Sequence, residues 1–250
     1  MSKIIAYVGA GGKTTSIIRE ARRCVLAGEK VLVTTTTHMR QPQIEREGTD
    51  LLTETVFEAK KQFEALNQHE APNQLEKVLL ESGSCRQPEE TKPGIAVWYG
   101  HPVSEQKFEG PSEEEWTELC KLVDKNLIDK ILVEADGSKC LPVKIPASHE
   151  PVIPVGTDKI IILMGMRGLG KPLKTVCHRL SLVCGLLKKE PDSILTEQDI
   201  ALLIIEGYVK PLRKAYPAAE IEVYLSQLES HELTQAAERI EGCCSEISGQ

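Results

Sequence analysis

The sequence predicts an open, mainly parallel α/β sheet in a doubly wound arrangement, with helices on both faces. Short apolar runs at residues 3–8, 31–33, 130–134 and 159–164 indicate buried strands. Between the first two runs, Thr14–Ala27 has apolar residues at helical spacing, and Gly28 provides a stop signal. Strand, helix and strand in close succession form a βαβ unit, whose strands run parallel. The alternation continues along the chain, which is typical of a sheet covered on both sides.

The remaining elements follow from the same patterns. We expect a strand over Ile95–Tyr99, a helix opened by a capping box at Ser112–Glu115 and ending near Asn126, a helix over Lys174–Lys188, a capped helix after Thr196, a strand over Ile221–Leu225 and a closing helix over His231–Ile240. Residues 41–94 are more polar, with a helix expected near Val56–Leu66 and a loop around Ser82–Pro93. We interpret this segment as a less regular insertion in a single domain of residues 1–250.

Composition excludes several classes of function. The formal net charge of −7 leaves no excess of Lys and Arg to neutralise phosphates, so a general nucleic-acid partner is not expected. The apolar run at residues 4–8 is too short for a signal peptide, and no run approaches the length of a membrane-spanning helix. We therefore expect a cytoplasmic protein with reduced thiols, in which Cys24, Cys120, Cys177 and Cys184 act as small apolar residues.

The strongest functional signal follows the first strand. The segment reads Gly9, Ala10, Gly11, Gly12, Lys13, Thr14 and Thr15. Its glycines allow a tight turn that aims backbone N–H groups inward, and the positive end of the next helix faces the same point. Lys13 would contact the β- and γ-phosphates, and the Thr14 hydroxyl would bind Mg²⁺. The segment predicts a phosphate-binding loop and a fold resembling P-loop NTPases.

The loop departs from the usual pattern G-x-x-x-x-G-K-[ST], because Tyr7 occupies the place of the first glycine. The shorter form G-x-x-G-K-T resembles the loop of the Mur-type peptide ligases. A second glycine-rich segment, Gly165–Pro172, has a proline where the hydroxyl residue belongs and therefore offers no metal ligand there. We expect that segment to line the site from a neighbouring strand.

Acidic residues end the strand at 130–134. Glu134 and Asp136 point the same way if the strand continues, and either carboxylate would bind Mg²⁺ together with Thr14. The threonines at 34–37 suit a strand by propensity alone, but their hydroxyls, Thr36 among them, would also suit Mg²⁺ or the γ-phosphate. His38 is a candidate for substrate contact or general base.

The proline-punctuated loop Leu141–Pro154 carries three further candidates. We expect this loop at the surface near the carboxyl ends of the strands, where open α/β sheets bind ligands. Lys144, His149 and Glu150 are its candidate substrate residues. Solvated side chains are the alternative interpretation for all three.

Several motifs in order resemble one family. These are Val8–Thr15, Val33–His38, Glu134–Lys139, Lys144–Ala147 with His149–Pro151, and the pair His178-Arg179. Together they resemble the YqeC family, described as selenium-dependent hydroxylase accessory proteins. The resemblance implies a nucleotide-dependent role in maturing selenium-dependent molybdenum hydroxylases such as xanthine dehydrogenase-like enzymes.

The resemblance also assigns residues. It carries phosphate binding onto the loop glycines, Lys13 and Thr14, and it favours the following as site residues: Thr36, His38, Glu134, Asp136, Lys144, His149, Glu150 and Arg179. Where the family often has a guanine-reading pattern after the last strand, this chain has Ser226-Gln227-Leu228-Glu229. The sequence therefore leaves ATP and GTP both open.

Three functional hypotheses remain at this point. The first is a nucleotide-binding, NTP-hydrolysing accessory protein, in which Lys13 and Mg²⁺ stabilise charge on the transferred phosphoryl group and Lys13, His38 and Asp136 are catalytic. The second is an ATP-dependent small-molecule kinase or ligase, and the third is a nucleotide-dependent switch that binds a hydroxylase client without turnover. Expected partners are a nucleotide and a molybdenum hydroxylase or other maturation factors. A homodimer is left open by analogy with P-loop proteins.

Overall fold

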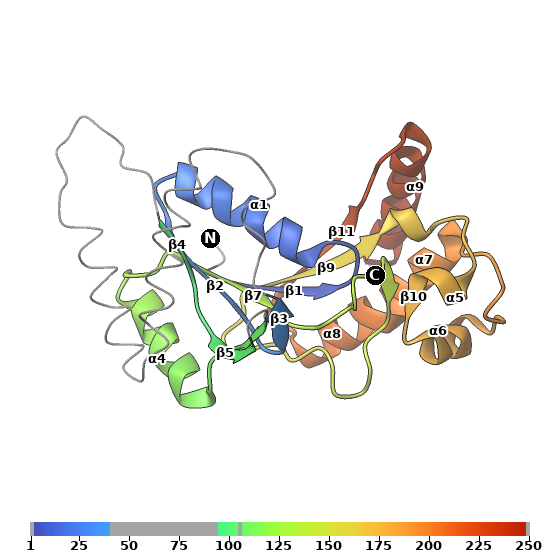
Figure 1. The fold of residues 1–250 in the computed structure, drawn as a ribbon. Coiled ribbons are helices and arrows are strands. Elements are labelled where there is room, and N and C mark those ends of the chain that lie inside the picture. Colours follow the sequence, from blue (N-terminus) through green and yellow to red (C-terminus); the bar gives the residue numbers. More distant parts are fainter. Residues whose placement is uncertain (1–2, 41–94, 105–106, 249–250) are drawn as a thin grey trace. The chain divides into compact units, whose positions relative to one another are not determined.

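A computed structural model describes residues 3–40, 95–104 and 107–248 (Figure 1). Six strands form one sheet in the order β11-β9-β1-β7-β2-β4. They are β1 (Ile4–Gly9), β2 (Lys30–Thr35), β4 (Ile95–Trp98), β7 (Lys130–Glu134), β9 (Lys159–Gly165) and β11 (Glu220–Ser226). The pairs β11/β9, β2/β4 and β2/β7 are all parallel. The predicted open, parallel α/β sheet is confirmed.

The chain divides into two compact units, and the described residues of the first are 3–5, 14–40, 95–104, 107–134 and 154–157. Its strands are buried on both faces. Leu32, Val97 and Ile131 share a cluster with Leu119 and Leu122 of helix α4 (Glu113–Asp124). The alternate strand residues, such as Val31 and Val33, are equally buried and point to the opposite face. Figure 1 shows helix α1 (Lys13–Leu26) on that opposite side of the strands.

The sequence predicted the described helices of this unit, α1 and α4, closely. Helix α4 begins with the expected capping box, in which the Ser112 hydroxyl accepts a hydrogen bond from the Glu115 N–H and the Glu115 carboxylate accepts one from the Ser112 N–H. Three short antiparallel strands also belong here: β3 (His38–Arg40), β5 (His101–Ser104) and β6 (Lys107–Glu109). The helix and loop expected within residues 41–94 lie outside the described residues.

The described residues of the second unit are 6–13, 135–153 and 158–248. Its core joins the apolar residues of β1 and β9 to those of the C-terminal helices, as Val8, Ile162 and Met164 cluster with Leu203 and Tyr208. The helical elements are η2 (Met166–Gly168), α5 (Leu173–Val176), α6 (Leu180–Leu187), α7 (Glu197–Ile204), η3 (Ile205–Val209), α8 (Lys210–Ala215) and α9 (His231–Ser248). The capping box at Thr196 and Asp199 is confirmed.

One helix prediction was wrong. The single helix expected over Lys174–Lys188 is two helices, because the chain between them forms the short strand β10 (Cys177–His178). This strand pairs in parallel with β8 (Val143–Lys144), so that His178 lies opposite Lys144. Arg179 then takes a left-handed conformation, with φ of 61°, before α6 begins. A local apolar pattern carries no information about a strand partner that lies more than 30 residues away.

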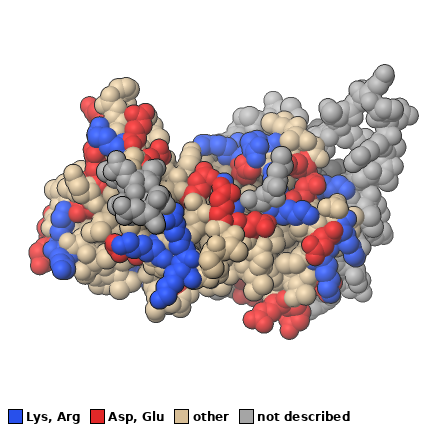
Figure 2. Space-filling model, turned by 180° about the vertical axis from the view of Figure 1, so that it is seen from behind, with Lys and Arg blue, Asp and Glu red and all other residues tan. Residues whose placement is uncertain are grey.

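The distribution of surface charge and the full or partial burial of most described cysteines fit what the composition led us to expect. On the face shown in Figure 2, basic and acidic side chains are interspersed over most of the described surface. Cys24 and Cys177 are buried, Cys120 and Cys184 are partly buried, and Cys140 is exposed. Among the described helices, none is both long and apolar enough to cross a membrane.

Candidate functional site

The loop after β1 depends on glycine at three positions. Gly9, Gly11 and Gly12 have φ angles of +92°, +89° and +105°, which L side chains rarely adopt. Two of them also lie against other backbone. A Cβ on Gly9 would be 2.1 Å from the Leu163 carbonyl oxygen, and one on Gly11 would be 2.4 Å from the Gly165 Cα. The loop is therefore fixed against the end of β9 at two points.

Hydrogen bonds fix the loop from the same direction. The Ala10 N–H donates to the Leu163 carbonyl at 2.8 Å. The Ser226 hydroxyl, at the end of β11, donates to the Gly11 carbonyl. Sequence reasoning treated Ser226 only as a replaced base-reading residue, and nothing in the sequence signalled this contact. Glu229, from the same replaced pattern, forms an ion pair with Arg167.

The loop presents backbone N–H groups that the described residues do not use. Among the described residues, none accepts a hydrogen bond from the Gly11 or Gly12 N–H groups. The first N–H groups of helix α1, which begins at Lys13, have no intrahelical acceptor either. Gly12 is exposed, and an added Cβ there would meet nothing within 4 Å. The Gly12 N–H therefore lies at an exposed point of the loop directly before the positive end of a helix, an arrangement that suits a phosphate group.

Lys13 and Asp136 form a buried ion pair beside this loop. Their side chains are 3% and 0% exposed, and Lys13 Nζ lies 3.2 Å from Asp136 Oδ1. Lys13 Nζ also donates to the Gly9 carbonyl at 2.7 Å, and the Gly9 N–H donates to Asp136 Oδ2 at 3.1 Å. Asp136 thus holds both the backbone and the lysine of the loop.

The ion pair continues into a longer chain of charges. Lys144 Nζ lies 3.1 Å from Asp136 Oδ2 and 2.8 Å from Glu150 Oε2, and it donates to the Gly137 carbonyl at 2.6 Å. Arg179 donates to both oxygens of Glu150, at 2.6 and 3.2 Å. We call Lys13, Asp136, Lys144, Glu150 and Arg179 the ion chain. Burial raises the pKa of Glu150, but the hydrogen bonds from Lys144 and Arg179 outweigh it and hold that pKa at about 2.

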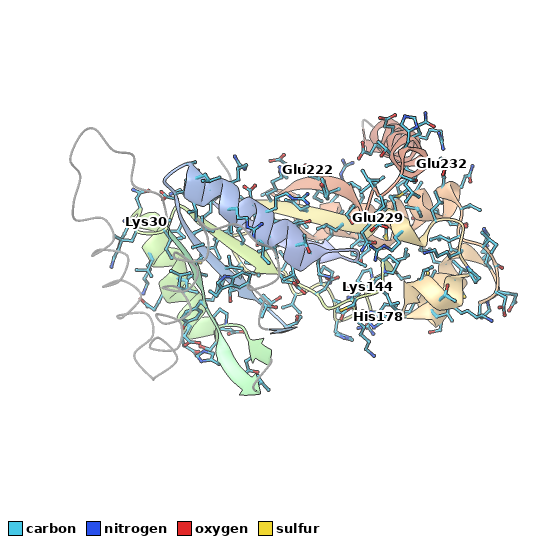
Figure 3. The ribbon with its side chains drawn as sticks, turned by 45° about the horizontal axis from the view of Figure 1, so that its top comes forward. Lys30, Lys144, His178, Glu222, Glu229 and Glu232 are labelled. Carbon is cyan, nitrogen blue, oxygen red and sulfur yellow. The ribbon has the colours of Figure 1, made fainter. Side chains whose placement is uncertain are left out.

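The structure corrects one expectation for the loop Leu141–Pro154. His149 is exposed, as predicted for this loop, but Lys144 is fully buried. The cause is the pairing of β8 with β10, which draws Lys144 into the interior beside two carboxylates. Figure 3 shows Lys144 and His178 close together on these two strands.

A second group of candidates lies in the first unit. The Thr14 hydroxyl donates to Glu134 Oε2 at 2.9 Å. A hydroxyl and a carboxylate oxygen are ligands that Mg²⁺ uses, with phosphate oxygens and water completing its coordination. This pair therefore fits the expected ion, although the described residues contain no cluster of three or more His, Cys, Asp or Glu side chains.

The threonines at and directly after the end of β2 bond mainly to backbone groups. The Thr34 hydroxyl donates to the Tyr99 carbonyl and the Thr35 hydroxyl donates to the Glu134 carbonyl, each at 2.7 Å. The Thr36 N–H also donates to the Glu134 carbonyl, at 3.1 Å, which places Thr36 beside the acidic strand end. Exposed Thr15 lies in the first turn of α1. The side chain of His38 lies outside the described part of the chain.

Two buried polar groups near the ion chain were not anticipated. Neither His178 Nδ1 nor the Tyr208 hydroxyl has a hydrogen-bond partner among the described residues. Burial, followed by the charges of Lys144 and Arg179, lowers the pKa of His178. Burial raises the pKa of Tyr208, and the charges of Asp136 and Glu150 add to the effect. The sequence signalled His178 only through the His178-Arg179 pair, and it gave no signal for Tyr208.

Comparison with known proteins identifies relatives. The model of the family described as YqeC protein matches residues 5–181. The chain is 29% identical over 208 residues to a protein of Escherichia coli (strain K12) named "Uncharacterized protein YqeC", covering 80% of this chain and 67% of that protein. No solved structure matches the chain.

Proposed function

The chain belongs to the YqeC family, and from this premise we propose that it binds a nucleoside triphosphate and Mg²⁺ and hydrolyses the nucleotide. The nucleotide would be ATP or GTP, bound through its phosphates. The resemblance of its motifs to selenium-dependent hydroxylase accessory proteins supports a role in the maturation of selenium-dependent molybdenum hydroxylases. A hydroxylase or another maturation factor would then be its protein partner.

One observation carries the proposal. The loop between β1 and α1 holds Gly11 and Gly12 with N–H groups that no described residue uses, directly before a lysine held on a buried aspartate. A turn that served only to connect a strand to a helix would not need a buried ammonium group beside these donors. Backbone N–H groups, a helix N-terminus and a lysine together supply the charge that a phosphate requires.

Each group of residues would have a separate role in nucleotide binding and hydrolysis. The loop N–H groups would orient the phosphates, and Lys13 would stabilise the charge that develops on the transferred phosphoryl group. Mg²⁺, when bound, neutralises charge on the β- and γ-phosphate oxygens. Thr14 and Glu134 would hold it, because their oxygens lie within hydrogen-bond distance of each other. Asp136 would keep Gly9 in place through the Gly9 N–H, and it would hold Lys13 beside the loop until a phosphate binds and Lys13 turns to it.

The test is Mg²⁺-dependent binding and hydrolysis of ATP and GTP by the wild type and by Lys13→Ala. We expect the substitution to weaken nucleotide binding at least about 10-fold, because a charge-assisted contact to phosphate is lost. The matched control is Lys121→Ala, which removes an exposed lysine of helix α4 whose partner is Glu118. The control should behave as the wild type, and thermal unfolding should show that both variants are folded.

Two results would contradict the proposal: no binding of either nucleotide by the wild type, or equal binding by the wild type and Lys13→Ala. Hydrolysis that requires an added small molecule would instead favour a kinase or ligase. Tight binding without hydrolysis, even in the presence of a molybdenum hydroxylase, would favour a switch.

A further inference from the structure

Lys144 is placed where no substrate can reach it directly. Its side chain is 0% exposed, and its ammonium group contacts Asp136, Glu150 and the Gly137 carbonyl. An ammonium group has three N–H donors, so these three contacts use all of them. Lys144 therefore acts on a ligand only through one of its neighbours.

The neighbour that matters is Asp136, which is itself fully buried. Without nucleotide, Asp136 is neutralised by both Lys13 and Lys144. If Lys13 turns to a bound phosphate, as the proposed function requires, Asp136 loses one of these two cations. A buried carboxylate that has lost its ion-pair partner is strongly destabilised. Lys144 remains in contact with Asp136 after Lys13 has moved, so the carboxylate stays compensated.

The rest of the ion chain keeps Lys144 in this position. Glu150 is held by two hydrogen bonds from Arg179, and it binds Lys144 at 2.8 Å. The pairing of Lys144 with His178 in the β8/β10 sheet fixes the backbone of both strands. Lys144 is thus held in place by Glu150 and Arg179, the end of the ion chain opposite to Lys13.

We propose that Lys144 is a positioning residue for nucleotide binding, which keeps Asp136 compensated when Lys13 leaves it for the phosphate. This inference rests on the proposed function. It predicts that Lys144→Met weakens nucleotide binding by about 10-fold or more, because release of Lys13 then leaves Asp136 without a cation. The nucleotide-free variant should still fold, since Lys13 continues to pair with Asp136 and Arg179 with Glu150.

The experiment separates this role from a purely structural one by removing the charge that Lys144 compensates. Affinity for the fluorescent nucleotides mant-ATP and mant-GTP is measured for the wild type, Lys144→Met, Asp136→Asn and the double variant. In the Asp136→Asn background, Lys144→Met should weaken binding by less than about 3-fold, because no buried carboxylate remains to be compensated. Lys130→Met is the matched control, because Lys130 is another buried lysine, paired with Glu29. That control should lower the melting temperature and leave the affinity unchanged.

Each outcome decides the question. The proposal is supported if Lys144→Met weakens nucleotide binding when Asp136 is present and has little effect in the Asp136→Asn background. Wild-type affinity in Lys144→Met, or an equal loss in both backgrounds, overturns it while leaving the proposed function intact. Failure of the wild type to bind either probe overturns both proposals together.

Discussion

Gly9 and Gly12 are a matched pair for measuring how strongly the loop between β1 and α1 depends on its backbone conformation. Both have positive φ, so alanine at either position is strained by about 1–3 kcal/mol. They differ in the space around them. A Cβ at Gly12 meets nothing within 4 Å, whereas one at Gly9 would lie 2.1 Å from the Leu163 carbonyl oxygen. That overlap is with backbone, so β9 must shift, which adds about 1–3 kcal/mol or more.

We therefore expect Gly9→Ala to lower the free energy of unfolding by about 2–6 kcal/mol and Gly12→Ala by about 1–3 kcal/mol. At roughly 2–4 °C per kcal/mol for a chain of this size, Gly9→Ala should lower the melting temperature by about 4 °C or more. Circular dichroism during heating and urea titration measures both variants. Equal destabilisation of the two variants would refute the argument, because it would mean that the close approach to Leu163 has no energetic consequence.

Two further predictions concern the second unit. The pKa of Glu150 is lowered from 4.5 to about 2, so its stabilising effect is complete above pH 4.5 and is lost as the pH falls towards 2. The difference in melting temperature between the wild type and Glu150→Gln should therefore shrink across that range, and a constant difference from pH 7 to 2 would contradict the assignment. Lys188 has a φ of +54° at the end of α6, so Lys188→Gly should raise the melting temperature by about 1–3 °C. The control Lys214→Gly, inside α8, should lower the melting temperature. A lower melting temperature in both Lys188→Gly and Lys214→Gly would contradict the strain argument.

The elements predicted correctly from the sequence are those whose causes are local. The strands β1, β2, β7 and β9 each contain a continuous apolar run, because a parallel strand covered on both faces buries most of its residues. The capping boxes at Ser112 and Thr196 lie within four residues, so their geometry could be expected from the sequence. The prediction of one helix over Lys174–Lys188 was wrong because β10 interrupts it. That strand forms by pairing with β8, which lies outside the local sequence pattern.

The candidate site shows the same division. Gly9–Thr15, Glu134 and Asp136 could be named from the sequence, because a glycine turn before a helix and acids at a strand end are short-range patterns. The sequence alone did not show that Lys144 is buried, that Asp136 is shared by two lysines, or that Ser226 donates to Gly11. These contacts join residues separated by 8 to 215 positions. Only the folded chain brings them within hydrogen-bond distance, because a charge or a hydroxyl has no preferred partner until tertiary packing removes water and leaves one available.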